Sequence, residues 1–226
     1  MSKSLPWAAV ATLLAMPLAA LGDDAGEYSF AILKDGAPVG VHRVAFDRAG
    51  ARIAIREATA IEVRLAMIPI YSFEHEARQI WENGRAVRID ATTNQNGKEL
   101  HITVRPAGRG YIRTVNGRVD RFDGSMAVLA FWNKDTLRHR AFFSAVEDET
   151  IRASFEFAGK ERITIAGAEL EVEHYRMVGD EERELWYDAA GHLAKVRLSR
   201  LGSEIEYVRD QLTPRAVGRS PCVGAC

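Results

Sequence analysis

The chain has 226 residues, of which 47% are hydrophobic, 27% charged and 8% aromatic, and its 30 Lys and Arg nearly balance its 31 Asp and Glu. This composition excludes a disordered protein, a collagen-like or low-complexity chain, and a strongly basic nucleic-acid-binding protein. We therefore expect a folded protein with no nucleic-acid partner.

Residues 1–22 have the layout of a secretory signal peptide. Lys3 precedes an uncharged apolar run over residues 5–21, and the small residues Ala20 and Gly22 occupy positions −3 and −1 of a cleavage site. The alternative is a membrane anchor, because 17 residues lie at the lower limit for spanning a bilayer. Two prolines interrupt the run and two aspartates follow it, which favours cleavage after Gly22. We expect a periplasmic or secreted protein with no stable membrane span after cleavage.

Apolar and polar residues alternate along most of the chain after residue 27, which predicts strands with one buried and one solvated face. The alternating segments are 28–32, 61–65, 71–81, 87–91, 100–104, 151–157, 170–174 and 205–207. This pattern is typical of antiparallel sheets, since strands of parallel sheets are apolar on both faces.

Two-residue turn signals separate the alternating segments. They are Asp35-Gly36, Asn83-Gly84, Asn96-Gly97, Asn116-Gly117 and Asp123-Gly124, with weaker versions at Ala166-Gly167 and Ala190-Gly191. Strands joined in this way form a meander, and we expect about ten to twelve of them. Long twisted strands curl, so the predicted fold is mainly all-β: a single strongly curved antiparallel meander sheet, as a half-barrel or an up-and-down barrel.

The alternation breaks down at residues 125–140, where we expect one short helix or irregular segment that covers an open end of the sheet. We expect a single β domain over residues 23–212 and a flexible C-terminal tail over residues 213–226, which is rich in Pro, Gly and Ser. Cys222 and Cys226 are the only cysteines. In an oxidising compartment they form a disulfide or stay as free thiols, whereas a closed zinc site needs four ligands. We predict no cofactor and no metal.

Several stretches together resemble a family of exported bacterial proteins of long-stranded β fold, a domain of unknown function. They are YSFAILKDGAPVGVHRVAF, IYSFEHEARQIWENGRAVRIDATTNQNGKEL, FWN and HYRMVGDEERELWYDAAGHLAKVRLSRLGSEIEYV, and the resemblance covers about residues 27–210. More distantly, the architecture is similar to that of LolA-like lipoprotein carriers. The resemblance implies a fold and a compartment but carries over no functional residue.

His75 and His174 both fall on the apolar phase of their strands, so we expect both on the inner face. Inward histidines serve proton transfer, metal binding or ligand binding, or they are hydrogen-bonded core residues. The other four histidines, His42, His101, His139 and His192, are explained by surface positions. The glutamates at positions 74, 76, 169, 171 and 173 lie on solvated phases, so a catalytic carboxylate pair is not favoured.

Aromatic residues gather on the predicted inner face, and a single short covering segment leaves that face incompletely covered. We therefore predict that the protein binds or carries an apolar small molecule, such as a lipid or an acyl chain. The predicted ligand-binding residues are Phe73, His75, Trp81, Trp132 and His174. One alternative is a hydrolase that uses the inward histidines with a carboxylate, although the protein is more plausibly not an enzyme. Another is an envelope protein that binds a partner through a sheet edge.

Overall fold

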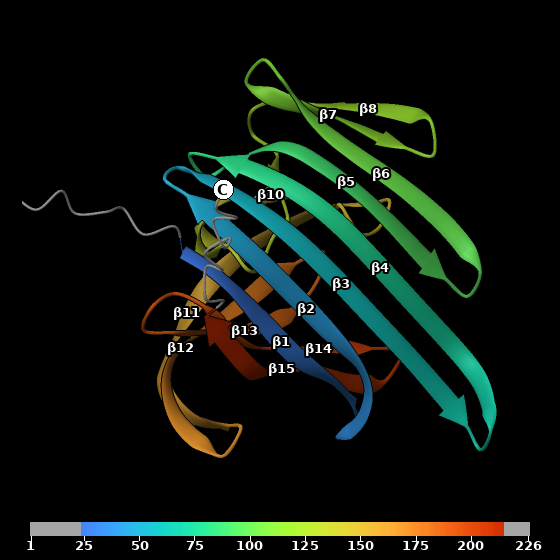
Figure 1. Cartoon of the computed structure of the whole chain (residues 1–226), viewed down its shortest axis with the longest axis vertical. Helices are drawn as coiled ribbons and strands as arrows, with labels where there is room; N and C mark the ends of the chain where they lie inside the picture. Colours follow the sequence, from blue (N-terminus) through green and yellow to red (C-terminus); the bar gives the residue numbers. More distant parts are fainter. Residues whose placement is uncertain (1–23, 215–226) are drawn as a thin grey trace, which may run out of the picture.

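The computed structural model describes residues 24–214 and contains one large sheet of fifteen strands within that range (Figure 1). The strands are β1 (Asp24–Lys34), β2 (Ala37–Ala49), β3 (Arg52–Leu65), β4 (Ile68–Glu82), β5 (Arg85–Gln95), β6 (Lys98–Ala107), β7 (Gly110–Val115), β8 (Arg118–Phe122), β9 (Ala127–Val128), β10 (Ala141–Phe143), β11 (Thr150–Ile165), β12 (Ala168–Gly179), β13 (Arg183–Asp188), β14 (Leu193–Arg200) and β15 (Ser203–Pro214). The last strand thus continues two residues beyond the expected end of the domain.

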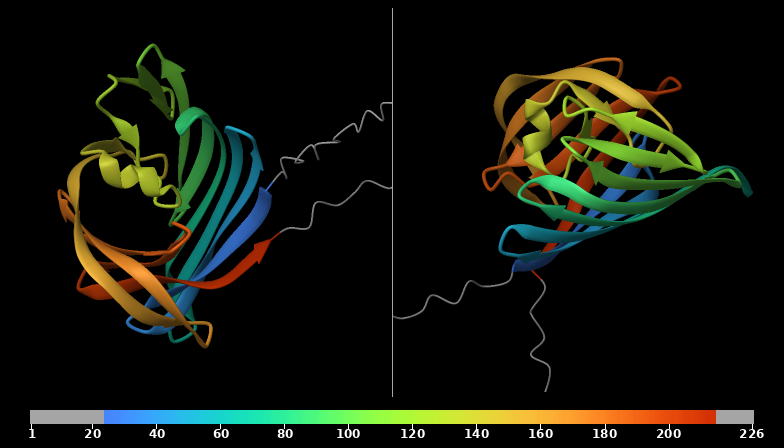
Figure 2. Two further views of the ribbon diagram at one scale, coloured as in Figure 1. Left: turned by 90° about the vertical axis from the view of Figure 1, so that its left-hand side faces the viewer. Right: turned by 90° about the horizontal axis from the view of Figure 1, so that it is seen from above.

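The sheet consists of two antiparallel meanders joined through the first and last strands. Its order is β8-β7-β6-β5-β4-β3-β2-β1-β15-β14-β13-β12-β11-β10-β9, and only the short β9–β10 pair is parallel. The sheet curls around an interior but does not close, because β8 and β9 remain at its two edges (Figure 2). The predicted antiparallel meander and half-barrel are therefore confirmed.

The predicted Asp-Gly and Asn-Gly turns at positions 35, 83, 96 and 116 all place both residues at positive φ, as type I′ hairpins require. Ala166-Gly167 does the same. The prediction for Asp123-Gly124 is wrong: neither residue has positive φ there. Asp123 instead accepts hydrogen bonds from the backbone N–H and the hydroxyl of Ser125, which bends the chain away from β8.

Fifteen strands exceed the expected ten to twelve, and the pattern missed the short ones. β7 and β8 have six and five residues, and β9 and β10 have two and three. In β7 the inner positions include Arg113, so the strand does not show an uninterrupted apolar phase. Hydropathy alternation is weak wherever a charged side chain is buried.

Residues 123–149 form the segment that breaks the pattern, and they lie over the concave side of the sheet (Figure 2). The segment contains β9, β10 and a 3-10 helix, Lys134–Arg138, whose N-cap Asn133 accepts a hydrogen bond from Asp135 N–H. Residues 24–214 contain no α-helix, and no helix among them is long and apolar enough to cross a membrane. The expected irregular segment is confirmed.

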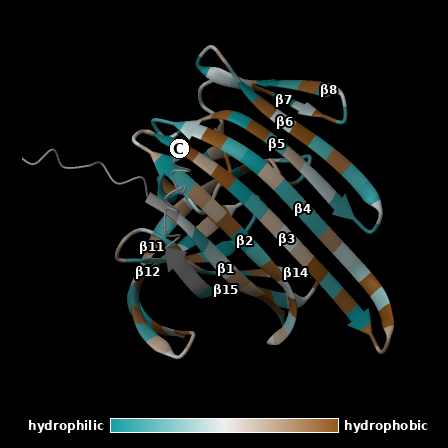
Figure 3. Ribbon diagram, in the orientation of Figure 1, coloured by the Kyte–Doolittle hydropathy of each residue, from teal (hydrophilic) through white to brown (hydrophobic). Residues whose placement is uncertain are grey.

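Brown and teal alternate along the strands in Figure 3, as expected when successive side chains point to opposite faces. The main core lies on the inner face and includes Phe30, Ile89, Phe143 and Tyr187. A smaller apolar cluster of Ile165, Val172, Trp186 and Ala194 lies apart from that core. Because Trp186 lies between the core residues Leu185 and Tyr187 on β13, this cluster belongs to the outer face.

The expected signal peptide at residues 1–22 and the cysteines at positions 222 and 226 lie outside the described residues.

Candidate functional site

A row of polar side chains crosses four neighbouring strands on the inner face. His42 of β2 is in register with Thr59 of β3, Thr59 with His75 of β4, and His75 with Thr93 of β5. His42 Nδ1 lies 2.8 Å from Thr59 Oγ1, and His75 Nδ1 lies 2.8 Å from Thr93 Oγ1. Hydrogen bonds between neighbouring strands thus connect histidine and threonine in two pairs, which we call the His–Thr row.

The hydrogen bonds of Thr93 fix the tautomer of His75. The Thr93 hydroxyl donates its only proton to Val146 O, at 2.8 Å, so Thr93 Oγ1 accepts from His75 Nδ1–H. A neutral imidazole with its proton on Nδ1 has a lone pair on Nε2. His75 is 3% exposed, and its Nε2 has no hydrogen-bond partner among residues 24–214. The inner face therefore presents one buried acceptor that only a donor from elsewhere can satisfy.

Both histidines of the row are held neutral. Burial lowers the pKa of His75 to about 4, and burial together with the nearby His75 lowers that of His42 to about 4. His42 is half-buried on the inner face, so its expected surface position is wrong. The sequence did indicate this position, because the apolar residues Val44 and Phe46 follow His42 at intervals of two and therefore lie on the same face of β2.

This low pKa predicts an acid-labile fold. The pKa of each histidine in the folded protein lies below the ordinary 6.5. As the pH falls from about 6.5 to 4, the unfolded chain therefore binds protons at these histidines and the folded chain does not, which favours unfolding. We expect the free energy of unfolding to lose up to about 3 kcal/mol per histidine over that range. Urea unfolding of wild type and His75→Gln at pH 7 and pH 4.5 measures it.

The variant should lose less stability than wild type on acidification. His101→Gln, at an exposed site, serves as the control and should behave like wild type. Glu57, whose pKa is raised, adds an opposite trend that is common to all three proteins and cancels in the comparison. An identical pH dependence for wild type and His75→Gln would contradict the prediction.

A second polar chain lies further along β4. Trp81 Nε1–H donates to Gln79 Oε1 at 2.7 Å, and Gln79 Nε2 donates to Glu57 Oε2 at 2.7 Å. Burial raises the pKa of Glu57 to about 7, although the bond from Gln79 opposes the shift. Glu57 therefore changes its charge near neutral pH.

Trp132 lies in residues 123–149, which we call the covering segment, and packs edge-on against Trp81 with ring centroids 5.1 Å apart. Its Nε1 is buried and has no hydrogen-bond partner among the described residues. The inner face thus holds an unpaired donor as well as an unpaired acceptor. An unsatisfied buried polar group costs about 1–3 kcal/mol, so both positions favour a ligand that supplies the missing partner.

The structure brings four of the five predicted ligand-binding residues to the inner face. Phe73, His75 and Trp81 are buried on the same side of β4, and Trp132 packs on Trp81. His174 is the exception, and its expected inward position is wrong. It is in register with Trp186 and stacks on that ring at 4.5 Å, in the outer cluster.

The reason for the error is that the sheet is apolar on both faces near β12–β14. Val172 and Trp186 supply an apolar phase on the outer face that looks the same in sequence as the inner one. There, His174 Nδ1 and Nε2 each lie 3.5 Å from a carboxylate oxygen, of Glu161 and Glu184. A hydrolase that acts through both His75 and His174 is excluded, because the sheet separates them.

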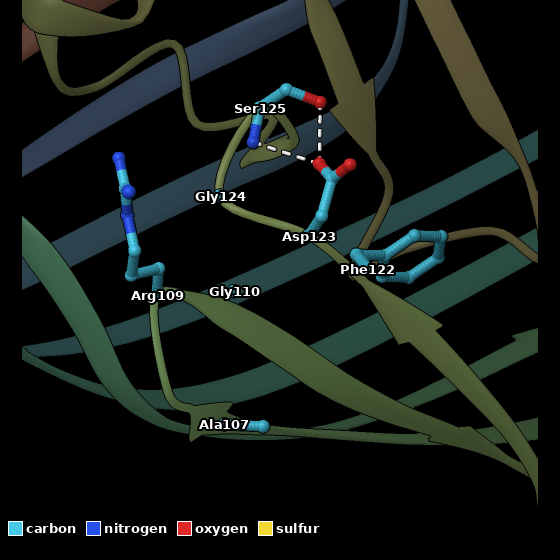
Figure 4. Close-up of a pocket in the computed structure, with 7 residues that line it drawn as sticks. All are labelled: Ala107, Arg109, Gly110, Phe122, Asp123, Gly124 and Ser125. Carbon is cyan, nitrogen blue, oxygen red and sulfur yellow. Dashed lines mark hydrogen bonds between the residues drawn. The ribbon is translucent and has the colours of Figure 1, made fainter.

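An open surface hollow of about 660 Å³ lies at the ends of β6, β7 and β8 (Figure 4). Its lining residues are Ala107, Arg109, Gly110, Phe122, Asp123, Gly124 and Ser125. The Asp123 carboxylate is engaged by Ser125, as the dashed lines show. None of the unpaired buried polar atoms of residues 24–214 belongs to this hollow. The inner face is therefore the better candidate site.

Sequence and structure comparisons agree with this fold. The chain is similar to the crystal structure of a β-barrel-like protein of domain of unknown function DUF1849 from Brucella abortus, with a TM-score of 0.65 and 8% identity over 87% of this chain and 100% of that chain. At this identity the likeness shows a shared fold alone. No curated protein matches the sequence. Residues 30–210 match the family described as Domain of unknown function (DUF6134), and the chain therefore belongs to that family.

Proposed function

We propose that this protein binds an amphipathic small molecule on its inner face and carries it in the cell envelope. The observation that carries the proposal is the buried, unpaired His75 Nε2, held by Thr93 as a hydrogen-bond acceptor. A ligand that satisfies this acceptor has an apolar body and a head group with an O–H or N–H donor. The signal peptide that we expect at residues 1–22 fits this function, because it would direct the protein to the cell envelope.

The surroundings of the His–Thr row supply apolar contact for such a ligand. Phe73, next to His75 on the same face of β4, is in register with Ile61, and the His42 ring packs against Phe30 and Tyr207. Six residues of strand, about 20 Å, separate His75 from Trp81 on β4. The Trp132 ring packs on Trp81, so Trp132 Nε1 is a separate unpaired donor that only a long ligand reaches together with His75. A hydroxyl or a protonated carboxylic acid provides the donor that His75 Nε2 lacks, whereas a carboxylate cannot donate to His75.

The sharpest test compares two probes that differ in one donor. We expect wild type to bind 1-decanol about fivefold more tightly than decyl methyl ether, because one hydrogen bond contributes about 1 kcal/mol. The change in tryptophan fluorescence on titration reports the binding. His75→Ala should bind both probes equally, because the acceptor is gone.

His174→Ala is the matched control, since it removes an outer-face histidine and should retain the preference for the alcohol. Native mass spectrometry of gently purified full-length protein should in addition show a bound small molecule. The proposal fails when wild type binds neither probe, or when His75→Ala keeps the preference.

Binding of a partner at a sheet edge has less support. β8 at one edge has five residues, three of them charged, and β9 at the other has only two. Short, charged edges disfavour the addition of a strand.

A further inference from the structure

The β3–β4 hairpin projects beyond the rest of the sheet. The pairing of β2 with β3 ends at Ile61, and the pairing of β5 with β4 starts at Phe73. The backbone of residues 62–71 therefore pairs only within the hairpin, which extends past both neighbouring strands at the lower right of Figure 1. We call residues 65–70 the hairpin tip.

The hairpin tip is apolar and exposed. Leu65, Met67, Ile68 and Ile70 are 69%, 83%, 67% and 57% exposed. Within residues 24–214, these four are half of the eight large hydrophobic residues that are exposed. Clusters of exposed apolar side chains mark interaction sites, because water contact with them is unfavourable.

The chemistry of the hairpin tip points to a neutral, apolar partner. No charged residue occurs between Arg64 and Glu74, and at the base Arg64 is paired with Glu62, which leaves no net charge. A protein partner that binds through charged side chains would find no opposite charge at the hairpin tip. The partner that best fits the hairpin tip is therefore electrically neutral at the place where the tip contacts it.

The shape of the hairpin tip disfavours two other occupants, a flat protein surface and an added partner strand. Side chains are exposed on a free-standing two-stranded ribbon, so a flat protein surface covers only one of its sides. Pro69 lacks an N–H and lies where the register between β3 and β4 shifts, which disfavours an added partner strand. A fluid apolar phase surrounds such a tip completely, and a lipid bilayer provides one.

We propose that the hairpin tip inserts into the apolar boundary of a lipid bilayer and anchors the protein reversibly at the membrane surface. This contact is distinct from the binding of a ligand at the His–Thr row and does not depend on it. Depth is limited by the Glu62–Arg64 pair, whose charges remain in the headgroup region.

The test is flotation of the full-length protein with phosphatidylcholine vesicles. We expect wild type to float with the vesicles at 0.1 M and 0.5 M NaCl alike, since no charge attraction is involved. Met67→Ser/Ile68→Ser should weaken the partition at least about 100-fold, because each buried aliphatic side chain contributes about a factor of ten or more. Both residues are exposed, so the melting temperature should not change.

Phe157→Ser is the matched control, since it removes a hydrophobic side chain that is 57% exposed on β11, and it should float like wild type. In Met67→Trp, vesicles should shift the tryptophan emission to the blue, and lipids brominated on the acyl chain should quench it. The proposal is overturned when wild type stays unbound, when the double variant floats equally, or when the tip instead drives concentration-dependent dimerisation without vesicle binding.

Discussion

Arg113→Ala is expected to lower the free energy of unfolding by about 3–5 kcal/mol, the usual result of removing one member of a buried ion pair. The Arg113 side chain is 3% exposed and donates to Asp120 Oδ2 at 2.9 Å and to Asp148 Oδ1 at 3.0 Å. It also donates to the carbonyl oxygens of Ser144 and Glu149. These bonds join β7, near one edge of the sheet, to the loop between β10 and β11, near the other.

Arg113 thus closes by its side chain a barrel that the backbone leaves open. Arg113→Lys should recover little, because an ammonium group does not reproduce the planar fork that reaches four acceptors. Arg118→Ala is the matched control: Arg118 binds the same two aspartates but is 54% exposed, so the loss should stay below about 1 kcal/mol. Urea unfolding measures all three variants.

Hydrogen exchange supplies a second measurement for Arg113→Ala. Amides of residues 144–149 should exchange faster in this variant than in Arg118→Ala, because the loop has lost its attachment to β7. Equal losses of unfolding free energy for Arg113→Ala and Arg118→Ala would contradict the prediction, because the bonds from Arg113 to residues 144–149 would then add no more stability than an exposed ion pair.

Phe143→Ala is expected to destabilise the fold by about 3–5 kcal/mol, as large-to-small changes at fully buried aromatic positions do. Phe143 is 0% exposed, stacks on Phe122 with centroids 4.6 Å apart and meets the Tyr111 ring edge-on at 5.4 Å. These contacts pack the covering segment against β7 and β8. Removing the ring leaves a cavity at the centre of that contact.

Phe157→Ala provides the comparison, because Phe157 is a phenylalanine of the same sheet but is 57% exposed. Its loss should amount to less than about 1 kcal/mol. Thermal or urea unfolding followed by circular dichroism gives both values. Similar values would mean that the covering segment is not part of the cooperative core.

The candidate site was predicted in part. The β4 residues Phe73, His75 and Trp81 followed from simple alternation along one long strand, and they share its inner face because side chains of a strand repeat every two residues. Thr59, Thr93 and Glu57 were missed, since a polar residue on an inner phase is visible only once the neighbouring strands are placed in register. His174 was misplaced because two apolar phases exist on its part of the sheet.

The sequence by itself determined the long strands, their antiparallel pairing and the meander, because alternation and Asn-Gly turns are local properties that act within each hairpin. The tertiary structure alone decided which face became the interior, where residues 123–149 pack, and that β1 pairs with β15 to join the two meanders. These outcomes depend on contacts between residues far apart in the chain. Arg113 shows the reason: its charge is tolerable in the interior only because the fold brings Asp148 and two carbonyl oxygens of a distant loop to its guanidinium group.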